Sequence, residues 1–589
     1  MKINIAFSRI FIIFLTGAVF GCLGAAALLS IFPSIFLLTF SHQILIISSV
    51  WLCFSAIFYL LIHWLAGRHD GMNALLSTEI NFQQLLVKTF LAVFFLFPIG
   101  LIASQHLKEF TRILTQGQTS NFLGQLLPKN GTRPFFIGVM VIGLFLVLAL
   151  FILRRKPRTK KYLDNLADRY YILFIMLAGS IIRLIFIYLV NTQPVSDFAN
   201  INSDAILLSQ GAEPTQLHIA THVLVTMIYG LFYRVLGPQL IVIKLFHLGL
   251  YALSGLFIYY AGKEIFENKL WAGAAGALVV TWPSLAIYSN VLTPEHLFIL
   301  VECALVFAVS RFFKNQASTE NGNKQGVILE LFWFVVIGFL LGVLGMFRPF
   351  SYLFLIAFLI SLFIFKRSFH LGRTVLNISV LLLVFLLLDS VPVVLGNFYH
   401  AYIPSSRPCN LLVGLNITTL GQFNIEDVNL CHDIRSQIPD KSAFAKKMTE
   451  IALNRLRTEQ NQLIPFVDKK FAILWTNSDG IIFWAINLVS DAKPYAILEM
   501  TQKINLVDFA MMFIATLACL AGTVMAFFKG IKPALFFYLL SFFGFNLMEI
   551  PFEIQTRYRT VVMPLFIFFA CWAFSTLNSA IGKWENKAN

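Results

Sequence analysis

Long apolar runs, each about as long as a bilayer is thick, follow one another along most of the chain. A helix needs about 20 apolar residues to cross ~30 Å of hydrocarbon. Fourteen runs meet this length, at residues 10–32, 43–65, 86–105, 135–154, 171–190, 239–261, 270–290, 296–313, 328–346, 349–366, 374–396, 506–528, 533–550 and 560–577. The pattern therefore predicts an all-α polytopic membrane protein with about 14 transmembrane helices.

Composition agrees with this pattern and excludes a water-soluble protein. Of 589 residues, 58% are hydrophobic and 12% are charged, whereas soluble domains carry about 25% charged residues. The first run follows Lys2 and Arg9, as a signal peptide would. It is too long for one, and no small-residue cleavage site follows it, so we expect a retained helix.

Basic loops orient the predicted helices. Short loops rich in Lys and Arg stay in the cytoplasm, and residues 154–161, 366–373 and 529–532 are such loops. We therefore expect a multi-pass protein of the cell (cytoplasmic) membrane with both termini in the cytoplasm. The net charge of +15 is spread over loops, so anionic lipid headgroups are expected partners and nucleic acid is not.

One apolar segment, residues 216–236, conflicts with a simple count of crossings. If it spanned the membrane, the basic loop 366–373 would lie outside. We interpret it as an embedded or interfacial helix that returns on the outer side. A fifteenth span, with one weak span elsewhere removed, remains the alternative.

Polar segments divide the chain into four parts. Residues 1–165 form a four-helix membrane module that ends in a basic loop, and 166–396 form a membrane core with a first outer loop at 191–238. Residues 397–505 form an outer loop domain with helical character at 440–475, and 506–589 carry the last helices. Cys409 and Cys431 share the outer domain, where a disulfide is permitted, and the sequence leaves their pairing open.

Ionisable residues beside apolar helices are the candidates for chemistry, because burying them is costly. Carboxylates can act as bases, and the forked guanidinium of an arginine suits phosphate. Helix caps, helix starts, interface anchors and a local salt-bridge cluster are the plainer interpretations. The candidates on the predicted outer face are Asp197, Asp204, Glu295, Arg348, Arg557 and Arg559. Neither a metal-ligand spacing nor a nucleotide-binding loop occurs in the sequence.

The order of several short motifs resembles the PMT-like (protein mannosyltransferase-like, family 39) glycosyltransferases of the C-type membrane superfamily. The resemblance covers about two thirds of the chain. The motifs are 196–198, 205–211, 236–237, 244–247, 265–266 with Lys269, 282–284, 288–289, 294–298, 342–349, 413–416, 421–424, 557–559 and 563–564.

This resemblance implies a C-type fold and transfer of a sugar from a polyprenyl-phosphate carrier, with no cofactor, to a glycan, lipid or protein outside the membrane. It places catalytic acids at Asp197 and Glu295 and interfacial helices in the first outer loop. We assign substrate contacts to Asp204, His222, Arg348, Arg557 and Arg559 and expect no metal. The chain departs from the family in its N-terminal module, and residues 213–218 lack a basic residue that some lipid-modifying relatives carry.

Two other functions remain open from the sequence. A transporter or lipid flippase would place charges in mid-membrane, for which Asp389 in the run 374–396 is a candidate. A non-catalytic subunit for the assembly or export of cell-envelope polysaccharide is the third hypothesis.

Overall fold

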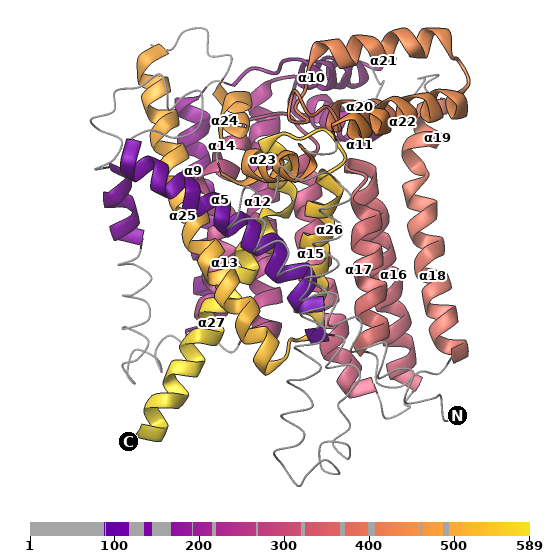
Figure 1. Ribbon diagram of the computed structural model, residues 1–589. Helices are drawn as coiled ribbons and strands as arrows, with labels where there is room; N and C mark the ends of the chain where they lie inside the picture. Colours follow the sequence, from indigo (N-terminus) through magenta and orange to yellow (C-terminus); the bar gives the residue numbers. More distant parts are fainter. Residues whose placement is uncertain are drawn as a thin grey trace.

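The computed structural model is a bundle of helices (Figure 1). It describes residues 87–88, 90–116, 135–143, 166–190, 192–214, 220–266, 269–319, 324–365, 371–398, 407–459, 462–476, 478–486 and 494–588. No strand occurs among these residues. The all-α prediction is therefore confirmed for the part of the chain that is described.

Seven of the described helices are long and apolar enough to cross a membrane: α9 (Asp168–Leu189), α12 (Leu240–Ile265), α15 (Glu295–Thr319), α16 (Lys324–Phe347), α18 (Leu371–Asp389), α25 (Pro494–Lys529) and the segment of η4 (Thr556–Val562) with α27 (Met563–Ala588). Shorter apolar helices include α13 (Lys269–Thr281), α17 (Ser351–Phe365) and α26 (Pro533–Glu549). The chain is a multi-pass membrane protein. The predicted spans 10–32 and 43–65 lie outside the described residues.

The described pieces of the N-terminal module pack on the C-terminal helices. The π-helix η2 (Leu91–Leu96) leads into α5 (Phe97–Gln116), which contacts α25 and α23 (Leu463–Trp475). Phe136 joins Phe509 of α25 in a small second core. The part of residues 1–165 that is described is thus built onto the main bundle.

Short helices gather at one end of the bundle (Figure 1). They are α10 (Asp197–Ser209), α11 (Ala220–Leu236), α14 (Pro283–Tyr288), α19 (Val391–Phe398), α20 (Arg407–Gly414), α21 (Ile425–Gln437), α22 (Lys441–Thr458), α23 and α24 (Asp479–Ile486). We call α20–α22, residues 407–458, the cap helices, and this end of the bundle the cap end. The loop 530–532 and the C-terminus lie at the opposite end.

The segment 216–236, expected to return on one side, corresponds to α11 together with residues outside the described part. α11 packs on α10, α16 and α19 and lies at the cap end with them. Gly230 permits this packing, because a Cβ there would crowd the backbone carbonyl of Ala205 in α10. The helices α9 and α12 on either side of this excursion therefore run in opposite directions.

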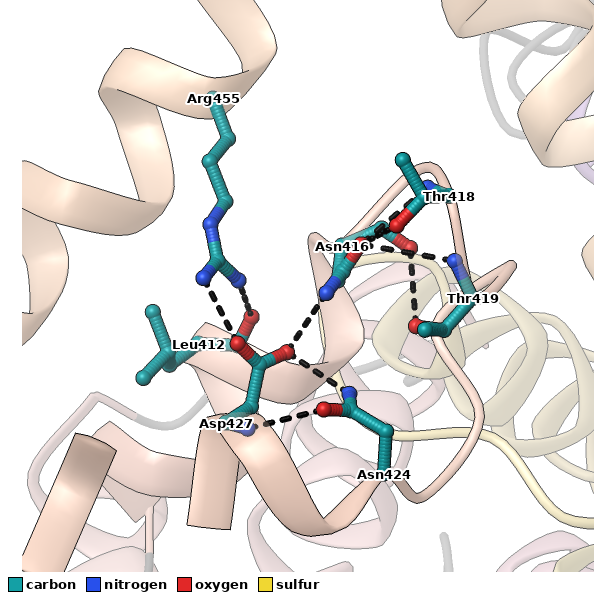
Figure 2. A network of polar contacts seen from close by, with 7 residues as sticks. All are labelled: Leu412, Asn416, Thr418, Thr419, Asn424, Asp427 and Arg455. Atoms are coloured by element: carbon teal, nitrogen blue, oxygen red, sulfur yellow. Dashed lines mark hydrogen bonds and ion pairs between the residues drawn. The ribbon is translucent and has the colours of Figure 1, made fainter. Parts of the chain in front are cut away.

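The cap helices have their own core and a polar network. Leu412, Cys431, Phe444 and Met448 are buried together, and Cys409 and Cys431 form a disulfide. The network is centred on Asp427 (Figure 2). Its carboxylate accepts from Arg455 at 2.6 Å, Asn416 at 2.7 Å and Asn424 at 2.8 Å. Because these bonds favour the charged form and outweigh the effect of burial, they lower the pKa of Asp427.

Candidate functional site

Four segments that are far apart in the sequence meet at the cap end of the bundle. They are the start of α10 at Asp197, the start of α15 at Glu295, the residue after α16, Arg348, and Arg557 in η4. The structure therefore brings together four of the seven predicted site residues.

Arg557 lies between aromatic rings. Its guanidinium carbon is 5.3 Å from the ring centroid of Phe198 and 4.8 Å from that of Trp484. The side chain is buried, its Nε has no hydrogen-bond partner, and no described carboxylate lies within ion-pair distance. Ring faces attract a cation but do not neutralise its charge, so Arg557, with its Nε unpartnered, is suited to an anionic ligand.

Asp197 is the first residue of α10 and precedes Phe198, which contacts Arg557. The residue before it, Ser196, has φ 50° and ψ −132°, a backbone region that residues other than glycine rarely occupy. Strain of this kind clusters at functional sites. Thr192 fixes the segment 192–196 before α10. Its hydroxyl donates to the Ala485 carbonyl, and its own carbonyl accepts from Lys244.

Glu553 adds a second carboxyl to this region. Burial raises its pKa, and the proximity of Asp197 adds to the rise. The charges of Asp197 and Glu553 therefore influence each other, and Asp197 is itself only half-buried.

Glu295 begins α15 and is fully buried. Its Oε1 accepts from Nη2 of Arg348, while its Oε2 has no hydrogen-bond partner. The guanidinium of Arg348 also lies 5.9 Å from the ring centroid of Tyr558, the residue after Arg557. An ion pair thus connects α15 and α16 next to the Arg557 side chain.

Unpartnered polar atoms surround Glu295. The hydroxyls of Tyr288 and Thr293 and both polar atoms of the Asn290 amide are buried without a hydrogen bond among the described residues. Burying such groups without partners costs free energy, and native structures satisfy most of them. The turn between α14 and α15 therefore offers hydroxyl and amide groups that a polar ligand or water could satisfy.

Two histidines below this turn are held by protein groups. Nδ1 of His247 is 2.8 Å from the Ser289 carbonyl and Nε2 of His296 is 2.8 Å from the Val291 carbonyl. The remaining ring nitrogens accept from Tyr229 and Tyr251. Each ring therefore uses one N–H and one lone pair, which is the pattern of a neutral imidazole.

The other predicted site residues lie elsewhere. Arg559 is fully buried, pairs with Asp508 of α25 at 3.1 Å and donates to the Leu474 carbonyl at 2.8 Å. Asp204 and His222 are buried in α10 and α11. Asp204 lies in the middle of α10, so it does not cap that helix.

Sequence reasoning missed the aromatic and tyrosine members of the site. They are Phe198, Trp484, Tyr288 and Tyr558. In an apolar chain with 15% aromatic residues, nothing in the sequence marks them as different from core residues. The exceptions are Phe198, Tyr288 and Tyr558, which lie in the motifs 196–198, 288–289 and 557–559, whereas Trp484 lies in none of the motifs.

Among the described residues, no group of three or more His, Cys, Asp or Glu side chains is placed to hold a metal ion. Asp389, the candidate mid-membrane charge, is the last residue of α18 and accepts from Tyr352 at 2.6 Å. Asp389 therefore lies at the end of α18, beside the start of α17, and not in the middle of the membrane.

No protein-family model matches the sequence, and no curated protein sequence matches it. Among solved structures, the chain is similar to the oligosaccharyltransferase of Archaeoglobus fulgidus, which was crystallised with a tethered acceptor peptide containing the sequon NVT. The TM-score is 0.39 and the sequence identity 11%, over 70% of this chain and 50% of the other. The chain spans about half the length of that oligosaccharyltransferase.

Proposed function

We propose that the protein is a membrane glycosyltransferase of the C-type class that transfers a sugar from a polyprenyl phosphate to an acceptor at its cap end. The observation that carries the proposal is Arg557, a buried guanidinium with no carboxylate partner, stacked on the residue that follows Asp197. A base and an anion-binding cation side by side are what such a transfer needs. The resemblance to PMT-like enzymes supports the same reaction.

Asp197 is the base in this scheme. Its carboxylate takes the proton of an acceptor hydroxyl or amine as the acceptor atom bonds to the anomeric carbon. The bond between that carbon and the phosphate oxygen breaks, and polyprenyl phosphate leaves with the electron pair. Attack opposite the leaving group inverts the anomeric centre.

Arg557 stabilises the charge that grows on the departing phosphate, because its Nε has no partner in the protein and the side chain is buried. Glu295, held by Arg348, and the hydroxyls of Tyr288 and Thr293 supply hydrogen bonds to the sugar. The lipid-linked sugar is the donor, and the proposal includes no cofactor.

By the distribution of basic loops, the cap end lies outside the cytoplasmic membrane. Lys529 and Lys532 flank the loop at the opposite end, and short basic loops stay inside. The acceptor is therefore a glycan, lipid or protein of the cell envelope.

The test is transfer from a defined donor by the purified full-length protein in lipid nanodiscs. Polyprenyl-phosphate sugars are supplied with short acceptors of the three classes, and release of polyprenyl phosphate is measured with wild type and Asp197→Asn. Release that depends on Asp197 supports the proposal. Absence of release with every donor, combined with movement of labelled lipid across proteoliposomes, would favour the flippase alternative.

A further inference from the structure

The loop that leads into Arg557, residues 550–555, is held by backbone hydrogen bonds with α20 and with the turn between α20 and α21. The amide of Glu553 donates to the Asn410 carbonyl at 3.0 Å, and the amide of Ile554 donates to the Gly421 carbonyl at 2.8 Å. This loop joins α26 to η4 within the bundle. Two backbone hydrogen bonds therefore join parts of the chain that are separated by more than a hundred residues.

Lys470 of α23 connects the loop 550–555 to α20 with further hydrogen bonds. Its Nζ donates to the carbonyls of Gly414 at 3.0 Å, Ile550 at 2.7 Å and Phe552 at 2.6 Å. The side chain is 1% exposed, and no described carboxylate lies within ion-pair distance of it. An ammonium has three N–H donors, and here each has its own carbonyl, one from the cap helices and two from the loop.

Two glycines, Gly414 and Gly421, allow this close contact, and a third, Gly480, allows η4 to approach α24. A Cβ at Gly414 would overlap the backbone of Phe552, and a Cβ at Gly480 would overlap the hydroxyl of Thr556. Gly421 has φ +70°, and a Cβ there would lie 2.8 Å from Nζ of Lys470. Two of these glycines belong to motifs 413–416 and 421–424, whose chemistry the catalytic proposal does not use.

We propose that Lys470 is a positioning residue through which the cap helices set the place of Arg557. This inference rests on the function proposed above. Without contacts to the rest of the protein, the loop 550–555 could shift by about 1 Å. Misplacement on that scale greatly reduces the effect of a catalytic group. Lys470 and the two backbone hydrogen bonds prevent such a shift. They fix the chain as far as Ile554, three residues before Arg557, whose guanidinium contacts Phe198 and Trp484.

The neutral, nearly isosteric variant Lys470→Met removes all three donors, and Lys469→Met is the matched control because Lys469 is exposed on the same helix. Amide exchange of peptides covering 550–556 is measured by mass spectrometry on purified full-length protein in nanodiscs. We expect the Glu553 and Ile554 amides to exchange at least about 10-fold faster in Lys470→Met, the effect of losing one hydrogen bond to a charged group. Lys469→Met should match wild type.

A second readout links the clamp to the reaction. With a polyprenyl-phosphate sugar, Lys470→Met should raise the donor KM by about 10-fold with a smaller change in kcat, and Lys470→Arg should recover part of the loss. Unchanged exchange in folded Lys470→Met overturns the clamp. Faster exchange with unchanged donor KM overturns its role toward Arg557.

Failure of the wild type to use any donor rejects the proposed function and with it the role toward Arg557, whereas the exchange result still decides whether Lys470 holds the loop. If Lys470→Met does not accumulate, Lys470→Gln, which keeps two N–H donors, takes its place with Lys469→Gln as control.

Discussion

Arg348 donates to Glu295 in a buried ion pair that joins the end of α16 to the start of α15. Arg348 therefore has a partner within the protein, whereas Arg557 has none among the described carboxylates. The two arginines, which the sequence presents as equivalent phosphate ligands, consequently differ in what they can do for a substrate.

The pair should be visible in stability. Arg348→Met leaves a buried carboxylate without its cation, which costs about 3 kcal/mol, so the thermal midpoint of the purified protein should fall. The double variant Glu295→Gln/Arg348→Met should recover part of that loss. Additive effects of the two single changes would show that the pair does not couple.

Arg557 should govern use of the donor. Arg557→Gln removes the cation and should lower kcat/KM for a polyprenyl-phosphate sugar by about 100-fold, the scale for one stabilising donor in an active site. Arg557→Lys keeps the charge but loses the planar fork that stacks and binds phosphate, so it should recover only part. The exposed Arg234→Gln on α11 is the control. Equal activity of Arg557→Gln and Arg234→Gln would remove Arg557 from the site.

Asp197→Asn keeps the size of the side chain, but the amide cannot accept a proton as the carboxylate does. Turnover should fall at least about 100-fold, the low end for a general base, while the donor still binds. Asp204→Asn, about two helical turns further along α10 and buried, should affect folding rather than proton transfer. Near-native turnover of Asp197→Asn with an inactive, folded Asp204→Asn would move the assignment to Asp204.

Acid should weaken the cap helices through Asp427. Its pKa is below the ordinary value of 3.8, so the bonds to Asp427 stabilise the fold above that value and are lost as pH falls through the lowered one. Asp427→Asn should therefore lower the thermal midpoint at pH 7. The difference in thermal midpoint between Asp427→Asn and wild type should become smaller below about pH 4. A gap that is the same at pH 7 and pH 3 would contradict this origin.

The two ends of the bundle should be labelled from opposite sides. Gln239, between α11 and α12, lies at the cap end, and Lys529 closes α25 at the other end. Both are exposed. A membrane-impermeant thiol reagent should reach Gln239→Cys but not Lys529→Cys in intact cells, with the unsubstituted protein as control. Labelling of Lys529→Cys but not Gln239→Cys would mean that the helices after α11 have the reverse orientation, as they would if α11 crossed the membrane.

The apolar runs predicted the helices well because a helix in lipid must satisfy its own backbone and cover one hydrocarbon thickness. The prediction was wrong where local chemistry intervenes. The run 270–290 is two helices, since Pro283 forces Trp282 out of helical geometry, at ψ 125°. The run 506–528 is the lower part of α25, which begins at Pro494, because hydropathy does not register a helix that continues beyond the membrane.

The site shows a similar limit. Arg557 and Arg559 stand two residues apart, and in the sequence either could bind a phosphate. They lie in the 3₁₀ helix η4, where three residues complete a turn, so the two side chains point in different directions. Arg559 forms an ion pair with Asp508, whereas Arg557 packs against the aromatic ring of Trp484. Neither the helix type nor these partners can be inferred from the order of residues.

The place of Arg557 in the chain also determines when the site exists. During synthesis, membrane helices are inserted from the N-terminus onward, and the Glu295–Arg348 pair can form once α16 and α17 are in the bilayer. Arg557 emerges only with η4, more than 200 residues after Arg348. A nascent or truncated chain that ends before residue 550 therefore carries Asp197 and Glu295 but lacks Arg557, so the proposed site cannot be complete until η4 has been synthesised and has packed on the earlier helices.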